Sequence, residues 1–316
     1  MAKAMAKAEA MAGGRAGGTS HASHESRGDH SSRASCSRGF TPRHRVVVRK
    51  RGRGRPSTST SRRSLPRTYE QALAQAHGAV RDALKDGEKL IEVEFPPLSL
   101  GAVCGDGEGS VEMDANLGHV LELSAMLVKE SKQKNLKVLL PEEKEEEELL
   151  SLKEAQYPNA SFGTGFLTNP SLLGDVGLDL FQKPITECID PEDSLFLAAY
   201  PSFSVNEMLA VEELHVEEPG TPIVVVNGEL DRFRSGYYPK LFYKKVAAMS
   251  SSFIPGFVGA FYLHNFKGRK PGSLFRRYPG PWQVFRRDAD TTEVRECIHE
   301  QDERPTLREI ALEYFV

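Results

Sequence analysis

The stretch LFLAAYPSFSVNEML, residues 195–209, decides the fold class of this 316-residue chain. Its first six residues form an apolar run typical of a buried β-strand, and Pro-Ser-Phe then turns the chain. Ser204 and Glu207 have the spacing of a capping box, which predicts that a helix begins there. The next apolar run, PIVVV at residues 222–226, is typical of a central strand in a parallel sheet.

The chain before this unit shows the same alternation. Thr68 and Gln71 form a second capping-box pattern, and the helical spacing after them ends at Gly87. The further predicted elements are a strand at 90–95 (LIEVEF), a helix at 116–130 and a strand at 137–140. Residues 158–179 are rich in Gly and Asn and predict a surface connection. We therefore predict an α/β fold, with a mostly parallel sheet flanked by helices.

After Asn227 the pattern changes to strands without helical periods between them. Runs punctuated by Gly and Pro occupy residues 258–266, 273–278 and 282–286, which predicts an antiparallel C-terminal extension of the sheet. Thr306 and Glu309 form a last capping box and predict a terminal helix.

Charge divides the chain near residue 67. Residues 1–67 contain 16 Lys and Arg against three acids, a net charge of +13, whereas residues 68–316 carry −16. No acid occurs between His30 and Tyr69, and Arg, Ser, Gly and Ala dominate there, as in an organelle transit peptide. Such a segment has too little apolar surface to fold. We predict a disordered leader at 1–67, cut between about 36 and 67, before one domain at 68–316.

An alternative interpretation of the leader is a DNA hook. Arg53-Gly54-Arg55-Pro56 has the composition of a segment that enters a narrow minor groove. Phosphate would repel a body with a net charge of −16, so we predict no nucleic-acid partner. The leader lacks the apolar segment of a secretory signal, and no run of 18 apolar residues predicts a transmembrane segment.

Motifs for catalysis and cofactors are absent from the sequence. It contains no GxxxxGK[ST], HExxH, GxSxG or DxDxDG, and the glycines of GDGEG at 105–109 do not complete GxGxxG. Cys104, Cys188 and Cys297 are widely spaced and odd in number, which argues against a disulfide framework or a CxxC metal site, and no two histidines after the leader stand four residues apart. We predict no catalytic residue, no metal site and no cofactor.

Residues 142–152 contain EEKEEEELL, the most acidic run of the chain. One hypothesis is a docking face for a basic partner. The other is a solvated helix whose first-turn acids interact with the positive end of the helix dipole, which is the commoner role of such runs.

The segment NGELDRFRSGYYP, residues 227–239, is the first candidate binding site. It follows the most apolar strand, and loops at the carboxyl ends of parallel strands line the binding crevice of open α/β sheets. Its candidate binding residues are Asn227, Glu229, Asp231, Arg232, Arg234, Tyr237 and Tyr238, which offer donors, acceptors and amphipathic rings. In the structural alternative, Asp231 pairs with an arginine and the tyrosines pack beneath the loop.

The segment GSLFRRYPGPWQVFRR, residues 272–287, is the second candidate. Arginines beside aromatic rings, including Arg276 and the single tryptophan Trp282, suit nucleic acid or a negatively charged protein surface. In the structural alternative, residues 279–281 form a rigid hairpin turn and Trp282 anchors the core.

Three stretches carry a resemblance to a known family: VVVNGELDRFRSGYYPKLFY, FYLHNFKGRKPGSLFRRYPGPWQVFRR and PTLREIALEYF. They resemble the plant and algal proteins of domain of unknown function 1995 (DUF1995), over about residues 68–316. The resemblance implies a chloroplast protein of the stroma or thylakoid surface that assists photosystem II assembly, by helping its chlorophyll-binding inner antenna subunit to be incorporated. The implied partners are photosystem II subunits or the thylakoid insertion machinery, with peripheral membrane association.

The resemblance brings no catalytic residue to this chain, so the expected function is that of a non-enzymatic assembly factor acting by transient protein binding. The same domain occurs beside an adenylate kinase in some plant proteins, which keeps a nucleotide-linked role open. The alternative is therefore a stromal enzyme or ligand-sensing domain that binds a nucleotide or pigment-related molecule in the crevice near residues 227–238.

Overall fold

The computed structural model describes residues 65–103, 109–130, 135–168, 185–239, 241–289, 291 and 293–315. Most of the predicted leader, residues 1–64, lies outside these ranges, as do Cys104 and residues 105–108 of the glycine-rich stretch. Two residues that we assigned to the leader, Leu65 and Pro66, are buried, and Leu65 belongs to the main core.

The amino-terminal half alternates helices and strands as predicted. Its elements are α1 (Tyr69–Lys85), β1 (Leu90–Glu94), α2 (Gly109–Glu130), β2 (Leu136–Leu140) and α3 (Glu143–Gln156). Thr68 caps α1 by accepting a hydrogen bond from the Gln71 backbone N–H. The acidic run forms α3, which buries Leu149 in the core and carries acids in its first turn.

Residues 158–179 are not only a surface connection, and this prediction was wrong in part. Residues 163–166 form the strand β3 (Gly163–Phe166), which pairs in parallel with β2 at the edge of the sheet. Two of its four residues are glycines, which have low strand propensity, so the local sequence did not indicate a strand. Residues 169–184 lie outside the described ranges, and a short 3-10 helix (Ile185–Cys188) follows them.

Residues 195–226, from which we predicted the fold class, form the predicted strand, helix and strand. β4 (Leu195–Ala199) is buried throughout, α4 (Val205–Glu217) begins with the Ser204–Glu207 capping box, and β5 (Ile223–Val226) is a fully buried strand.

Residues after β5 differ from the prediction in three places. The segment 227–239 contains a short helix, α5 (Leu230–Arg234), where we expected a loop, and both α6 (Lys244–Ser252) and β9 (Val294–Gln301) were missed. The remaining elements match: β6 (Val258–Phe266), β7 (Gly272–Arg277), β8 (Trp282–Arg287) and the terminal helix α7 (Leu307–Tyr314).

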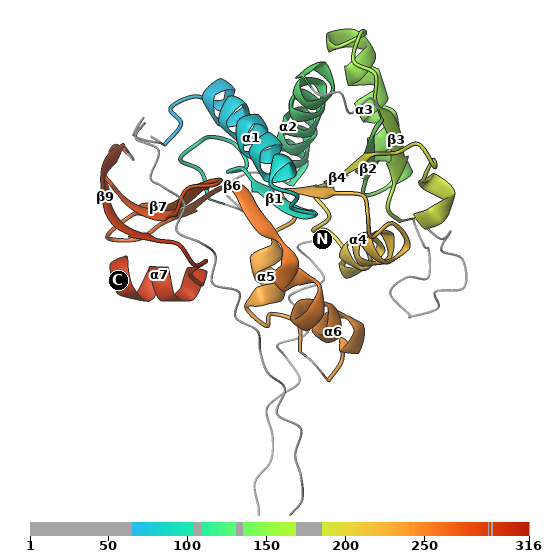
Figure 1. Cartoon of the computed structure of the whole chain (residues 1–316). Coiled ribbons are helices and arrows are strands. Elements are labelled where there is room, and N and C mark those ends of the chain that lie inside the picture. Colours follow the sequence, from blue (N-terminus) through green and yellow to red (C-terminus); the bar gives the residue numbers. More distant parts are fainter. Residues whose placement is uncertain are drawn as a thin grey trace, which may run out of the picture. The chain divides into compact units, whose positions relative to one another are not determined.

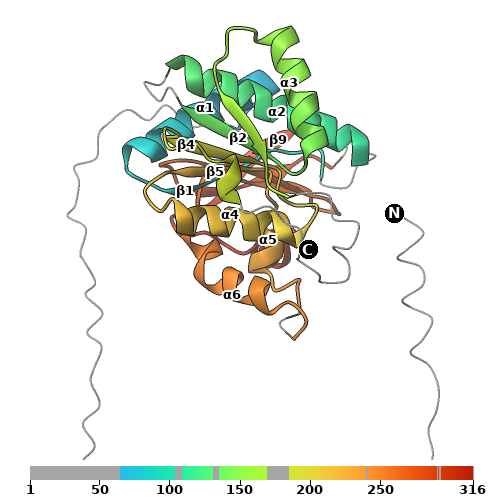
Figure 2. The same ribbon diagram turned by 90° about the vertical axis from the view of Figure 1, so that its right-hand side faces the viewer.

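The described strands form one nine-stranded sheet in the order β3-β2-β4-β5-β1-β6-β7-β8-β9. Neighbours from β3 to β6 are parallel, and β6 to β9 are antiparallel, which confirms the predicted mixed sheet. Figure 1 shows the sheet between two helix layers, with α1, α2 and α3 on one face and α4 to α7 on the other. Figure 2 shows the same layers from the side.

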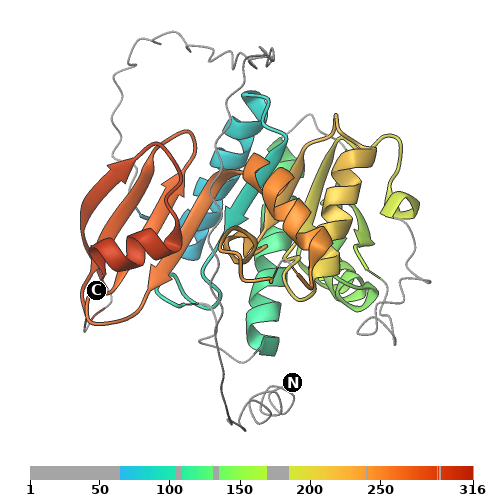
Figure 3. The same ribbon diagram turned by 90° about the horizontal axis from the view of Figure 1, so that it is seen from below.

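Two large apolar clusters fill the space between the sheet and its helices. The α1–α3 face buries one set of strand residues, and the α4–α6 face buries the alternate set, so central strands such as β5 have no solvated side. A third, smaller cluster lies under α7, over the antiparallel strands. Figure 3 shows α7 (red) over those strands, apart from the yellow and orange helices that cover the parallel strands. No helix in the described part of the chain is long and apolar enough to cross a membrane.

Candidate functional site

The carboxyl ends of β1 and β5 mark a switch point of the sheet. The chain leaves β1 toward α2 on one face, and it leaves β5 toward α5 on the other, although the two strands are neighbours. Ligands of open α/β sheets bind at such points. Asn227 (φ 52°) and Glu229 (φ 48°), which follow β5, have left-handed backbone conformations. Residues other than glycine seldom adopt such conformations. Such conformations cluster at binding and active sites.

Asn227 holds this switch point together. Its Oδ1 accepts from the Phe95 backbone N–H at 2.7 Å, and its Nδ2 donates to Asn116 Oδ1 at 2.6 Å. The side chain is buried and joins the ends of β1 and β5 to α2. Asn227, which we predicted as a binding residue, therefore uses its side chain to link these three elements.

A buried ion-pair cluster lies on the α5 side of β1, centred on Glu92. Glu92 is fully buried, and Arg234 of α5 contacts both of its carboxylate oxygens, at 3.0 and 2.9 Å. Arg304, just before α7, approaches the same carboxylate at 2.6 and 3.2 Å. We call Glu92, Asp231, Arg234, Tyr262 and Arg304 the Glu92 cluster. It joins a central strand to two helices from different parts of the chain.

Asp231 is the second acid of the Glu92 cluster. Its Oδ2 accepts from Arg304 Nη2 at 2.7 Å and from the Tyr262 hydroxyl at 2.6 Å. Burial opposes its ionisation, but the guanidinium groups of Arg304 and Arg234 outweigh burial and hold the pKa of Asp231 below its usual range. Burial, and then the charge of Asp231, raise the pKa of Tyr262 well above its ordinary value, so its hydroxyl remains a donor.

Aromatic rings enclose the Arg304 guanidinium. It lies 4.7 Å from the ring centres of both Tyr262 and Trp282, a cation–π arrangement. Gly259 is the strand neighbour of Glu92 on β6, and a Cβ there would lie 3.0 Å from the Trp282 ring and 3.6 Å from Arg304 Nη1. The missing side chain thus makes room for both groups beside Glu92. Burial disfavours the charge of Arg304, but the two acids raise its pKa above its ordinary value.

A cavity of about 670 Å³ opens beside the Glu92 cluster, between α5 and the start of α7. Strand residues Glu94, Tyr262 and His264 line it, and Glu94 is the strand neighbour of Tyr262. Its other walls come from the α5 segment and from residues 304–308. A volume of this size accommodates a small molecule or a few side chains of a partner.

Glu94 is the one acid in this cavity that has a buried oxygen without a partner among the described residues. Its Oε2 is closed off from solvent and makes no hydrogen bond there, although the residue as a whole is only half-buried. Burial, reinforced by neighbouring carboxylates, raises the pKa of Glu94 well above its ordinary value. Burial also lowers the pKa of His264, so the imidazole is held neutral. The cavity therefore offers a carboxyl group and a ring that suit a ligand with hydrogen-bond donors.

The other predicted residues of the segment 227–239 divide between the cavity, a packed aromatic contact and the surface. Glu229, Asp231, Arg232 and Arg234 line the cavity. Tyr238 stacks on Phe233 at 5.2 Å, which is the packing of the structural alternative, whereas Tyr237 is 66% exposed.

The second candidate segment is mainly structural. Trp282 is buried in the cluster under α7, and residues 278–281 turn the chain between β7 and β8. Arg276 Nε donates to the Gly280 carbonyl at 3.2 Å, and its guanidinium lies 5.1 Å from the Trp282 ring. These contacts are those of the structural alternative. The Trp282 ring therefore contacts the guanidinium groups of both Arg276 and Arg304.

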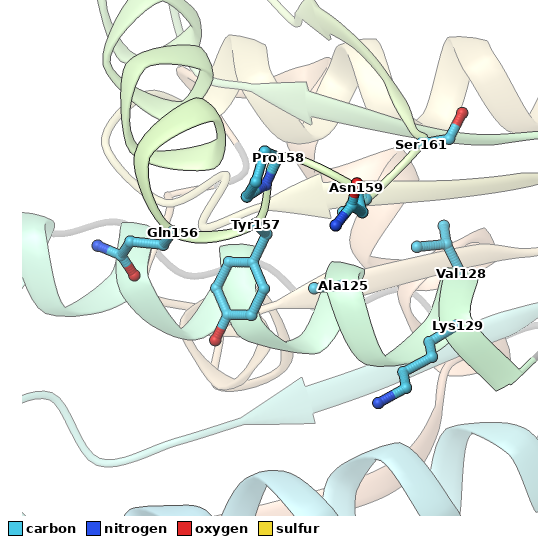
Figure 4. Close-up of a pocket in the computed structure, with 9 residues that line it drawn as sticks. Ala125, Val128, Lys129, Gln156, Tyr157, Pro158, Asn159 and Ser161 are labelled. Carbon is cyan, nitrogen blue, oxygen red and sulfur yellow. The ribbon is translucent and has the colours of Figure 1, made fainter.

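A second cavity lies on the other helix layer. Figure 4 shows it where the C-terminal half of α2 faces the residues that follow α3, and its volume is about 610 Å³. Among the described residues, no group of three or more His, Cys, Asp or Glu side chains is arranged to hold a metal ion.

The sequence model of one family, described as a domain of unknown function (DUF1995), matches residues 66–312. The chain belongs to the DUF1995 family. No curated protein and no solved structure matches it. The matched range runs from the start of α1 into α7, so the Glu92 cluster and its cavity lie wholly within the DUF1995 domain.

Sequence reasoning missed five residues of this DUF1995 site: Glu92, Glu94, Tyr262, His264 and Arg304. The available signal was LIEVEF, where two acids alternate with apolar residues in a strand. Alternation of this kind is typical of a half-buried strand, whose polar residues face solvent. β1 is instead a central strand covered on both faces, so both acids lie within the helix layer that contains α5.

Replacing Arg304 by Met is expected to reduce the free energy of unfolding by about 3–5 kcal/mol, because Arg234 alone then balances the two buried carboxylates of Glu92 and Asp231. Tyr262→Phe removes one hydrogen bond but no charge and should cost about 1–2 kcal/mol. Arg308→Met, in the exposed wall of the cavity, is the matched control and should change stability by less than about 0.5 kcal/mol. Urea titration measures all three. Equal unfolding midpoints for the Arg304 and Arg308 variants would show that the charge of Arg304 does not stabilise the Glu92 cluster.

Replacing Glu94 by Gln is expected to stabilise the protein at neutral pH, by an amount of the order of 1 kcal/mol. Because the folded-state pKa is raised, the unfolded state ionises first as the pH rises, and the wild-type protein loses stability from about pH 4.3 upward. Below that pH the carboxyl is protonated in both states, and the variant has no advantage. Urea titrations between about pH 4 and 8 test this, with the exposed Glu296→Gln as control. A gain that is the same at acid and neutral pH would contradict the assignment.

Proposed function

We propose that this DUF1995 protein is a non-enzymatic auxiliary factor of the chloroplast, which assists photosystem II assembly by transient protein binding. The step concerned is the incorporation of the inner antenna subunit. The three quoted stretches resemble the chloroplast protein Low PSII Accumulation 3. The acid-poor leader at residues 1–67 supports chloroplast import independently of this resemblance.

One observation carries the proposal: the three stretches, which are separate in the sequence, surround one cavity. The first contains α5, the second contains residues 261–266 of β6 together with β7 and β8, and the third, residues 305–315, contains all of α7. Side chains from all three line the cavity beside the Glu92 cluster. The resemblance is therefore concentrated at this cavity, which we assign as the contact site for a segment of the partner.

The chemistry of the cavity favours binding over turnover. The carboxylates of Glu92 and Asp231 are held by arginines, and the Tyr262 hydroxyl donates to Asp231, so these groups are already engaged. Arg232 and Arg308 are exposed cations of its lining, and Tyr262 and His264 contribute rings. Rings beside exposed cations suit a polypeptide segment that brings an apolar anchor and acidic neighbours.

Pulse labelling of newly made thylakoid proteins tests the assembly role in cells that lack the protein. We expect the inner antenna subunit to be synthesised normally but to be missing from photosystem II intermediates on native gels. Wild-type protein should restore assembly. Arg308→Glu should restore it poorly, because it reverses an exposed charge in the lining of the cavity.

Lys85→Glu is the matched control, because it reverses an exposed charge on α1, in the opposite helix layer. It should restore assembly fully. Normal assembly in cells without the protein would overturn the proposed role. Full restoration by Arg308→Glu would show that the cavity is not the contact site for the partner.

A second candidate function is supported by the unpartnered Glu94 Oε2: the recognition of a small molecule, such as a nucleotide or a pigment-related compound. Donor groups of the ligand would satisfy Glu94, and anionic groups would face Arg232 and Arg308.

Melting temperature measures this second function, because a ligand at about 100 times its Kd adds about 2.7 kcal/mol of stability. We expect a nucleotide or pigment precursor to raise the melting temperature of the wild type and to leave that of Glu94→Gln unchanged. No shift of the wild type with millimolar compounds of either class would count decisively against this function.

A further inference from the structure

The segment between α5 and α6 exposes apolar side chains to an unusual degree. Leu241 is 77% exposed and Phe242 is 78% exposed, the highest values of any large apolar residue among those described. Tyr237 and Tyr243, on either side, are 66% and 43% exposed. We call residues 235–239 and 241–243 the α5–α6 loop. Contiguous exposed apolar surface of this kind marks a contact with a protein or a membrane.

The α5–α6 loop is a built structure that holds these side chains outward. The backbone N–H groups of Phe242 and Tyr243 both donate to the Pro239 carbonyl at 3.1 Å, which closes a tight turn. At its base, Tyr238 stacks on Phe233 of α5 and contacts the rings of Tyr237 and Tyr243 edge-on. Figure 2 shows the orange segment around α6 at the outer side of its helix layer, away from the sheet.

The charge around the α5–α6 loop is positive. Residues 232–287 contain 12 Lys and Arg and no acid, although residues 68–316 together have a net charge of −16. Lys244 and Lys245 directly follow the exposed residues and are themselves exposed. Acids that contact this region come from earlier in the chain: Glu229 pairs with Arg232, while Glu212 and Glu213 of α4 line a cavity with Lys245. Lys244 stands two residues after Phe242 in the sequence.

We propose that the α5–α6 loop inserts into the surface of a lipid bilayer that contains anionic headgroups. Leu241 and Phe242 enter the apolar region, the tyrosines lie at the interface, and Lys244 meets the headgroups. Two consecutive, highly exposed apolar side chains beside basic residues suit a deformable lipid phase with anionic headgroups, whereas a protein partner would need a matching pocket. The insertion is independent of the cavity, and pure lipid vesicles test it without any photosystem subunit.

Tryptophan fluorescence of the full chain reports insertion directly. Phe242→Trp adds an exposed indole, and the single natural tryptophan, Trp282, is buried and should not respond. With phosphatidylcholine vesicles that contain about 30% phosphatidylglycerol, we expect a blue shift of the added emission, and a weaker shift with phosphatidylcholine alone. Leu312→Trp, an exposed position on α7, should show no shift.

Vesicle flotation gives a second readout. Leu241→Ser with Phe242→Ser should reduce binding by at least about tenfold, because most of the inserted apolar surface is lost. Val216→Ser with Leu312→Ser removes exposed apolar side chains elsewhere and should leave binding unchanged.

The basic leader also attracts anionic vesicles, so binding alone does not establish the proposal. Binding that survives the loop substitutions, or a Phe242→Trp emission that does not move, would assign the contact to the leader and overturn the insertion. A blue shift seen only with detergent-solubilised thylakoid protein, and not with vesicles, would overturn it in favour of a protein partner.

Discussion

A single buried carboxylate organises one face of this protein. Glu92 lies in the middle of β1, fully excluded from water, and its charge requires partners there. Arg234 arrives from α5, and Arg304 arrives from the segment before α7, which is 212 residues away in the sequence. Both guanidinium groups reach both carboxylate oxygens, so the positions of α5 and α7 relative to the sheet follow from this one charge.

The Glu92 cluster explains features that would otherwise be unrelated. The register between β1 and β6 shifts at Glu92, where a bulge alters the direction of the strand beside the site. Gly259 faces Glu92 and leaves room for Arg304 and Trp282. Well-packed apolar residues are often at least as stabilising as a buried ion network, so stability alone does not account for it. Its specific consequence is a fixed distance between α5 and α7, and hence an open cavity between them.

The fold could be predicted from the sequence where burial is a local property. LFLAAY and PIVVV are apolar whatever surrounds them, and the capping boxes at Ser204 and Thr306 depend on residues three positions apart. The missed strands β3 and β9 are edge strands, one rich in glycine and the other in charged residues, as is common where a sheet must avoid pairing with other chains.

The site was only half predictable, for a related reason. Asp231 and Arg234 could be found because they follow a buried strand, at a position where crevices form. Glu92 and Arg304 could not, because their roles depend on which strand is central and on which distant segment crosses it. A strand with two acids looks half-exposed until its neighbours are known. The contact between Arg304 and Trp282 likewise requires the β7–β8 hairpin to lie beside β6, which no local pattern encodes.

The cavity and the α5–α6 loop share one short helix, and this connects the two proposals. Arg234 ends α5 and is held by Glu92, so the chain leaves toward the loop from a fixed point on the sheet. A loop anchored in this way does not need to order itself on contact with a membrane, which lowers the entropy lost on binding. Electrostatic repulsion also favours contact through the loop. The acidic helix α3 lies in the opposite layer, and an anionic surface repels it. A membrane that receives the loop therefore approaches the face that contains the cavity, where a newly inserted membrane subunit would present its exposed segments.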